Sequence, residues 1–210
     1  MASDAFRFLI PLLAAAALLA FAGSAWLALL AVLLAAFVCY FFRNPRRTIP
    51  SGPKLVVAPA DGKIVKITEV GRAGEGGNRL TQVSIFLNIF DVHINRAPLA
   101  GRIVDVAYHK GAFLPAFDHK ASLSNEQNCV TIDGRRSRVA FKQIAGLIAR
   151  RIVFRKRVGD NVARGERVGL IKFGSRVDLF LPRETVLRVA VGDRGAGGVT
   201  VIGELPVGAR

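Results

Sequence analysis

Three residues able to carry nucleophilic chemistry stand in separate segments of the 210-residue chain. Ser175 follows Gly174 in "RVGLIKFGSRVDLFLP", His93 ends the run "FLNIFDVH", and Asp61 lies in the turn "APADGK". A histidine held by a carboxylate can take the proton of a serine hydroxyl and make its oxygen a nucleophile. Because the order of such residues along a chain is free, the three are candidates for one site.

Each candidate also has an ordinary structural explanation. A glycine inside a strand pattern usually marks a β-bulge or a close backbone approach. Asp and Gly are common in turns because of their backbone preferences, and this alone could explain Asp61. A single histidine in a β domain is more often structural than catalytic. The G-x-S-x-G elbow of esterases is absent around Ser175. The three histidines, at positions 93, 109 and 119, lack zinc-site spacing, so no metal is expected.

The N-terminal part of the chain is a long apolar segment. No charged side chain occurs from Phe8 to Phe42, and about 18 apolar residues suffice for a transmembrane helix. We predict that residues 1–45 form a helical membrane segment, either one tilted helix followed by an interfacial helix or two short helices in a re-entrant hairpin. Three arginines follow at positions 43–47, so the positive-inside rule places the next domain on the cytoplasmic side of the cell (inner) membrane.

The second part of the chain, residues 46–210, has the pattern of a β domain. Ten short runs are rich in Val, Ile and Phe, and Gly- and Pro-rich turns separate them. We therefore predict a mainly β fold, a β-sandwich or a barrel-like domain. The runs are KLVVA, KIVKITEV, TQVSIFLNIF, GRIVDVAYH, NCVTI, RVAFKQIAG, RIVFRKRV, RVGLIKF, RVDLFLP and TVLRVAV.

The formal net charge of +15 lies beyond the apolar segment. A basic excess of this size suits a polyanion, either nucleic acid or an anionic lipid surface. The membrane segment favours lipid, and neither a nucleic-acid-binding module nor a basic patch with interleaved aromatic residues is recognisable. We therefore expect an anionic phospholipid membrane as partner, and no nucleic acid. The two cysteines give no metal motif and no disulfide framework.

Four motifs together resemble the phosphatidylserine decarboxylase family. They are "VVAPADGKIV", "VSIFLNIFDVHINRAPLAG", "YHKGAFLPAFDHKASLSNEQN" and "KFGSRVDLFLP". Their order, spacing and local residues match the family over about residues 50 to 192. The short length and the N-terminal apolar segment are similar to the compact bacterial branch of the family.

The resemblance implies a proenzyme that cuts itself between Gly174 and Ser175. The products would be a β chain, residues 1–174, and an α chain, residues 175–210, which stay together as a heterodimer; assembly beyond that is left open. Ser175 would become a covalent pyruvoyl group, so pyruvate is the implied cofactor. Its ketone would form a Schiff base with phosphatidylserine and accept electrons as CO₂ departs, which yields phosphatidylethanolamine for phospholipid biosynthesis.

The resemblance also implies roles for the polar residues. His93, oriented by Asp61, would be the base of self-cleavage. Longer members carry a second histidine three residues before the His93 equivalent, where Phe90 stands here, so either His93 serves twice or His119 donates the proton during decarboxylation. The loop "GAFLPAFDHKAS" is similar to the family's substrate loop. The candidate substrate-binding residues are Phe90, Phe113, Phe117 and His119.

Two other functions remain open from the sequence. A membrane-anchored peptidoglycan peptidase of the lysostaphin type shares runs such as "APADGKIV", but its zinc site needs an H-x-H pair, which this sequence lacks. The other alternative is not an enzyme but a basic, membrane-anchored binding domain. In that protein the Gly174-Ser175 pair would be only a β-bulge.

Overall fold

The computed structural model describes residues 3–71, 79–112, 125–135, 137–146, 151–171 and 174–206. Phe113, Phe117 and His119, three of the candidate substrate-binding residues, lie outside this part of the chain. Two compact units are distinguished, Met1–Arg46 and Arg47–Arg210. The first consists of helices and the second of β-strands, so each unit follows from a different hydrophobic pattern in the sequence.

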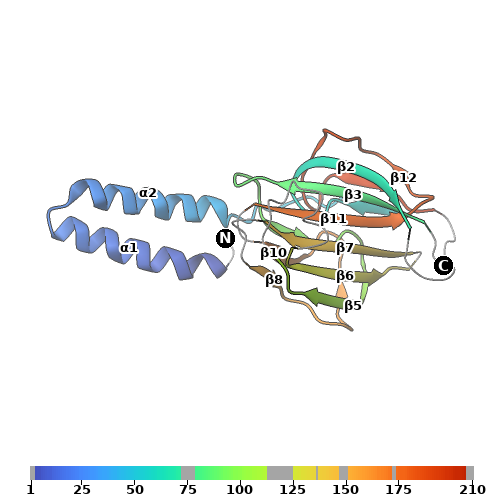
Figure 1. The fold of residues 1–210 in the computed structure, drawn as a ribbon, viewed down its shortest axis with the longest axis horizontal. Coiled ribbons are helices and arrows are strands. Elements are labelled where there is room, and N and C mark those ends of the chain that lie inside the picture. Colours follow the sequence, from blue (N-terminus) through green and yellow to red (C-terminus); the bar gives the residue numbers. More distant parts are fainter. Residues whose placement is uncertain are drawn as a thin grey trace. The chain divides into compact units, whose positions relative to one another are not determined.

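The first unit is a hairpin of two helices. A short 3-10 helix, η1 (Ser3–Ala5), leads into α1 (Phe6–Phe21), which packs against α2 (Ala25–Phe41); Figure 1 shows them running side by side. Gly23 adopts a φ of +77° in the turn between them, a conformation that favours glycine. Two helices therefore form from residues 1–45, but no helix in the described residues is both long and apolar enough to cross a membrane.

The second unit is built around one eight-stranded sheet and two small ones. The order in the large sheet is β13-β2-β3-β11-β7-β6-β5-β9, and it curls from β2 to β5 (Figure 1). The small sheets are β1-β14-β12 and β4-β10-β8. The strands are β1 (Leu55–Val57), β2 (Gly62–Val70), β3 (Leu80–Leu87), β4 (Ile94–Arg96), β5 (Gly101–His109), β6 (Gln127–Asp133), β7 (Arg138–Ala145), β8 (Ile152–Phe154), β9 (Asn161–Val162), β10 (Arg167–Ile171), β11 (Ser175–Pro182), β12 (Val186–Leu187), β13 (Arg194–Gly195) and β14 (Val201–Glu204).

The mainly β fold predicted for this part of the chain is confirmed. Each of the ten predicted runs contains a strand. The strands β4, β9, β13 and β14 were not predicted, because two to four residues are too few to show a period-2 pattern. Every pairing between the named strands is antiparallel, as expected for strands that short turns connect.

The core lies against one face of the large sheet. Successive residues of a strand point to opposite faces, so alternate positions of β11 share one face. Val177, Leu179 and Leu181 are fully buried in this core, and burying each such side chain contributes about 1.5–3 kcal/mol. Ser175 continues the same row at the start of β11. The alternation that builds the core thus also carries the Ser175 side chain into the interior.

A buried polar cluster fixes the other face of β11. Arg176 donates from Nε to Asp178 Oδ1 at 2.8 Å, and Gln82 of β3 donates from Nε2 to Asp178 Oδ2 at 2.9 Å. The side chains of Arg176 and Asp178 are 5% and 1% exposed. A one-residue slip of β11 against β3 would place these charges in the apolar core. The cluster therefore sets the register that places Ser175 at the end of the strand.

Candidate active site

The Gly174-Ser175 bond lies between strands of two different sheets. β10 ends at Ile171 in the sheet β4-β10-β8, whereas β11 begins at Ser175 in the middle of the large sheet. Ser175 pairs with Leu87 of β3 on one side and with Ala145 of β7 on the other. The interpretation of the glycine as a bulge within one continuous strand is therefore wrong. It stands at the point where the chain passes from one sheet to the other.

The backbone of Gly174 is in the left-handed region, with a φ of +59°. A Cβ built at this position would meet no atom of the described residues within 4 Å outside its two chain neighbours. Crowding by the described part of the fold is therefore not the reason for the glycine. The reason is the conformation itself, which costs an L-residue about 1–2 kcal/mol. The residue on the acyl side of the candidate bond is thus held in a turn that only glycine adopts easily.

This explanation predicts a difference between two glycines. In the Ser175→Ala background, which keeps the chain intact, Gly174→Ala should lower the free energy of unfolding by about 1–2 kcal/mol. Gly71→Ala is the matched control, because a Cβ there also meets no described atom within 4 Å but the backbone has no positive φ; the change in the free energy of unfolding should stay within about 0.5 kcal/mol. Urea denaturation of the full chain in detergent measures both. Equal effects would contradict the conformational explanation.

The Ser175 side chain is enclosed. Ser175 is fully buried, and its Oγ has no hydrogen-bond partner among the described residues. A buried hydroxyl without a partner costs about 1–3 kcal/mol, and such groups are rare enough in proteins to need an explanation. An unengaged Oγ beside a peptide carbonyl is what an internal nucleophile requires, because no existing hydrogen bond has to be broken before it attacks.

His93 lies against the same bond. The histidine is 2% exposed, and its Nε2 is 3.3 Å from the main-chain N of Gly174. Its Nδ1 is 2.9 Å from the main-chain oxygen of Asp91. Since the carbonyl can only accept, Nδ1 carries the proton and Nε2 has the lone pair that accepts the Gly174 N–H. A neutral imidazole with its basic nitrogen one residue from Ser175 can act as a general base once it exchanges that N–H for the hydroxyl.

Asp61 lies at the same end of the large sheet but has other partners. Its Oδ2 forms an ion pair with Arg47 Nη2 at 2.7 Å, with the two side chains 17% and 10% exposed. Its Oδ1 accepts the N–H of Gly197 at 2.8 Å. The carboxylate thus fixes the segment that enters the β unit and the turn before β14. That Asp61 also orients His93 stays a prediction.

Arginines surround this carboxylate. Burial lowers the pKa of Arg96 from its usual value, and the charge of Arg47 lowers it further, whereas the negative charge of Asp61 opposes the shift. Arg96 also donates from Nη1 to the main-chain oxygen of Gly165 at 2.9 Å. The positive charges near Asp61 therefore belong to residues that also hold the surrounding loops in place.

The remaining candidate, Phe90, lies on the turn that precedes His93. Phe90 is 62% exposed, and its N–H donates to Asn88 Oδ1 at 2.8 Å. An exposed aromatic ring this close to the candidate site suits contact with an apolar ligand. Within the described residues, no group of three or more His, Cys, Asp and Glu side chains could hold a metal ion.

Sequence reasoning missed several residues that hold the site. Asp91 stands in the quoted run "FLNIFDVH", but nothing in that run indicates that its main-chain oxygen binds the histidine. Arg194 and Gly197 lie 103 and 136 positions from the groups they contact, and Arg47 lies 14 positions from Asp61. The folded chain brings these groups together, so a motif could not have revealed the contacts.

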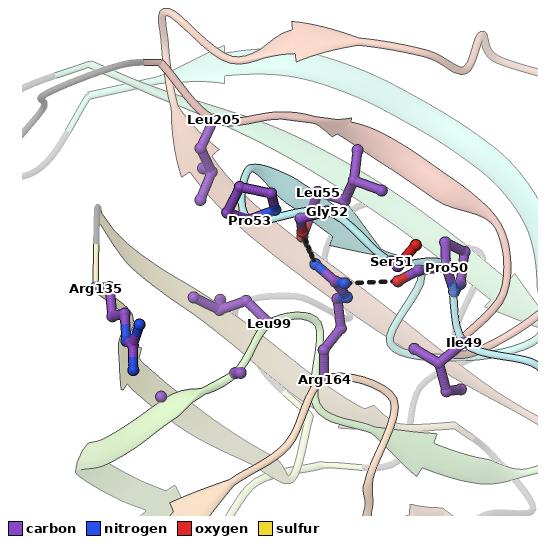
Figure 2. Close-up of a pocket in the computed structure, with 12 residues that line it drawn as sticks. Ile49, Pro50, Ser51, Gly52, Pro53, Leu55, Leu99, Arg135, Arg164 and Leu205 are labelled. Atoms are coloured by element: carbon purple, nitrogen blue, oxygen red, sulfur yellow. Dashed lines mark hydrogen bonds between the residues drawn. The ribbon is translucent and has the colours of Figure 1, made fainter.

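A pocket of about 780 Å³ lies elsewhere in the β unit (Figure 2). Arg164 is one of its lining residues, and the guanidinium donates to the main-chain oxygens of Pro50, Gly52 and Leu55. This arginine therefore fastens the segment that leads into β1. The lining residues are Ile49, Pro50, Ser51, Gly52, Pro53, Leu55, Leu99, Ala100, Gly101, Arg135, Arg164 and Leu205.

The pocket is distinct from the candidate site. Gly101 begins β5 and Arg135 follows β6, and the pairing of β5, β6 and β7 places both at the Arg138 end of β7. Ser175 pairs with Ala145, at the opposite end of that strand. The residues able to do chemistry are therefore not in the pocket but in the enclosed region around the Gly174-Ser175 bond.

Comparison with known proteins finds close relatives along nearly the whole chain. The family model described as phosphatidylserine decarboxylase matches residues 34–203. A protein named phosphatidylserine decarboxylase proenzyme from Solibacter usitatus (strain Ellin6076) is 50% identical over 200 residues, 95% of this chain and 94% of the relative. Proteins of the same name from Carboxydothermus hydrogenoformans and Chlorobium phaeobacteroides are 48% and 47% identical, over 86% and 93% of this chain and 85% and 92% of theirs.

Proposed function

The chain belongs to the phosphatidylserine decarboxylase family, and we propose that it cuts itself at the Gly174-Ser175 bond and then decarboxylates phosphatidylserine with a pyruvoyl group made from Ser175. Membership of this family removes the peptidase and the non-enzymatic binding domain as alternatives. The observation that best supports self-cleavage is the enclosed serine: its Oγ is buried and has no hydrogen-bond partner among the described residues, and it adjoins a glycine at φ +59° whose N–H contacts His93.

Self-cleavage begins with attack of Ser175 Oγ on the Gly174 carbonyl carbon. His93 takes the hydroxyl proton and returns it to the Ser175 nitrogen as the peptide C–N bond breaks, which turns the amide into an ester. Removal of the Ser175 α-proton then breaks the Cβ–Oγ bond and leaves a carboxylate on Gly174. The remaining dehydroalanine isomerises, and water replaces its nitrogen as ammonia, so that a ketone stands at position 175.

The residues around position 175 suit this group. The pyruvoyl ketone supplies a carbonyl that condenses with the amine of phosphatidylserine and accepts electrons as CO₂ leaves. The buried position of Ser175 keeps bulk water away from that carbonyl. His93 lies against the same backbone and is the proposed donor of the proton that the product takes up. Phe90, exposed on the adjoining turn, is the proposed contact with the lipid.

The cut would leave two chains that cannot separate without unfolding. β11, the first strand of the α chain, pairs with β3 and β7, which both belong to the β chain. β13 and β14 pair with β2 and β1 in the same way. Residues 175–210 thus contribute to the large sheet and to one of the small sheets, and the mature enzyme is an αβ heterodimer held by strand pairing and by the shared core.

The helical hairpin is the proposed membrane anchor. Phe21 and Trp26, on either side of the turn, are 94% and 84% exposed, and apolar exposure of this extent marks a surface that meets lipid. At the other end, the Arg43 guanidinium lies 3.9 Å from the centre of the Tyr40 ring, a pair suited to the headgroup region. The arginines at 43–47 and the net charge of +15 favour the anionic cytoplasmic face of the inner membrane.

Purified full-length protein tests the reaction directly. In detergent micelles that contain phosphatidylserine, it should release CO₂ and form phosphatidylethanolamine in equal amounts. Free serine is the control substrate, because it has the same amine and carboxylate but no lipid; it should give no more CO₂ than the micelles alone. A protein that is fully cut yet leaves phosphatidylserine unchanged would contradict the proposed reaction.

A further inference from the structure

The orientation of the His93 ring depends on the residue two positions before it. The main-chain oxygen of Asp91 accepts the Nδ1 proton of His93 at 2.9 Å. This bond leaves the lone pair on Nε2, the nitrogen that faces Gly174 at 3.3 Å. A displacement of the Asp91 carbonyl would therefore rotate the ring or change which nitrogen can take a proton. Whatever holds this carbonyl also controls the base.

The side chain of Asp91 closes the turn that carries this carbonyl. Its Oδ2 accepts the N–H of Asn88 at 2.9 Å, and its own N–H donates to the Asn88 oxygen at 3.1 Å. Asn88 Oδ1 accepts the N–H of Phe90 at 2.8 Å. These bonds join residues 88 and 91 in both directions, as Asx side chains do in tight turns. The Asp91 side chain is 11% exposed, so water competes little for them.

The other carboxylate oxygen reaches a residue beyond the cleavage site. Asp91 Oδ1 accepts a hydrogen bond from Arg194 Nη2 at 2.5 Å. Arg194 belongs to β13 at the edge of the large sheet, where it pairs with Lys63 of β2. His93 and Asp91 precede the Gly174-Ser175 bond, whereas Arg194 follows it. The ion pair would therefore join the β chain to the α chain after the cut.

We propose that Asp91 and Arg194 are positioning residues for His93. Asp91 holds the carbonyl that keeps the proton on Nδ1, and Arg194 holds the carboxylate of Asp91. The α chain thereby supports the histidine that serves both self-cleavage and, through the function proposed above on which this inference rests, the decarboxylation. Neither residue touches the reacting atoms.

Self-cleavage kinetics give the first test. Full-length chains made by cell-free synthesis are followed on denaturing gels. Asp91→Ala should slow the cut by about 10- to 100-fold, the scale on which small misplacements of catalytic groups act. Asp91→Asn keeps an acceptor for the Asn88 N–H, so it should slow the cut less than Asp91→Ala does. Arg194→Ala should slow the cut by about 2- to 5-fold, because the arginine is 61% exposed and such ion pairs are individually weak.

Arg188→Ala is the matched control. Arg188 forms an ion pair with Glu204 at 2.9 Å and is 57% exposed, close to the exposure of Arg194, but this pair joins the residue after β12 to the end of β14. The control should cut at the parental rate. If Arg188→Ala were slowed as much as Arg194→Ala, or if Asp91→Ala cut at the parental rate, the positioning role would be wrong. A parental chain that does not cut would instead contradict the proposed function.

The ring tautomer gives a test that does not depend on cleavage. In the uncut Ser175→Ala chain with ¹⁵N-labelled histidine, NMR should show His93 as a single species protonated on Nδ1. Adding Asp91→Ala should produce a mixture of the two tautomers, whereas adding Arg188→Ala should change nothing. A His93 that keeps only the Nδ1-protonated form in the Asp91→Ala chain would overturn the inference.

Discussion

A chain that carries Ser175→Ala should remain in one piece and should release no CO₂ from phosphatidylserine. Alanine removes both the oxygen that attacks the Gly174 carbonyl and the Cβ–Oγ bond whose cleavage leads to the ketone. Loss of a serine nucleophile costs about a million-fold in related acyl chemistry, so no cut chain should be visible over days. Denaturing gels measure the cleavage, and formation of phosphatidylethanolamine measures the activity.

Ser84→Ala is the control for this substitution. Ser84 is also fully buried on the large sheet, in β3, but its Oγ accepts a hydrogen bond from Gln82 at 3.0 Å and it pairs with Asp178. A chain with Ser84→Ala should still be cut, because the loss affects only local packing. If the Ser175→Ala chain were cut at the parental position, a nucleophile other than Ser175 would have to do the chemistry.

The second large effect is expected for His93→Ala. The substitution removes the basic nitrogen that lies against the Gly174 backbone, and general base catalysis of this kind contributes about 10²- to 10⁴-fold. Self-cleavage should slow by that factor in a time course of cell-free synthesis. His93→Gln separates the proton transfer from the hydrogen bond, since the amide oxygen can still accept the Gly174 N–H but cannot take a proton. It should be slowed nearly as much.

His109→Ala is the control for the histidine series. His109 ends β5 and is exposed, so its loss should leave the rate unchanged. Added imidazole should restore part of the rate to His93→Ala, because it refills the space that the side chain leaves. Cleavage of His93→Ala at the parental rate would show that another group is the base, while the family and Ser175 as nucleophile would stand.

Much of the fold and of the candidate site could be predicted from the sequence, because both depend on local patterns. Period-2 alternation of apolar residues marks β3, β7 and β11, the strands that meet at Ser175. The motifs "APADGK", "FDVH" and "KFGS" contain Asp61, His93 and Gly174, and strand pairing brings all three to one end of the sheet. The left-handed backbone of Gly174 also follows from its residue type, because glycine adopts this conformation readily.

What could not be predicted depends on contacts between distant segments. Asp91 and Arg194 are 103 positions apart, and Asp61 and Gly197 are 136 apart. In each case the sequence shows that a carboxylate is present. It does not show which hydrogen-bond donor the order of strands in the sheet brings to that carboxylate. The sequence likewise did not indicate that Arg47, beyond the apolar segment, forms an ion pair with Asp61, and the orientation of His93 by Asp61 stays a prediction.

The apolar segment shows a different limit. Its composition indicates contact with lipid, but the break at Gly23 decides the length of each helix. Composition alone left two arrangements open, one tilted helix followed by an interfacial helix or two short helices in a re-entrant hairpin, and a turn at Gly23, which has a positive φ, separates the two observed helices. Hydrophobicity therefore did not fix the number and length of the helices, and their contact with lipid stays a prediction.

The intact mass of the protein purified from cells tests the central claim most directly. Under denaturing conditions we predict two chains, residues 1–174 and residues 175–210, the second lighter by one ammonia than a peptide with an ordinary N-terminal serine. Its N-terminus should be blocked to sequencing and should react with hydrazines as a ketone does. A single uncut chain, or a second chain that begins with a free serine, would contradict the account.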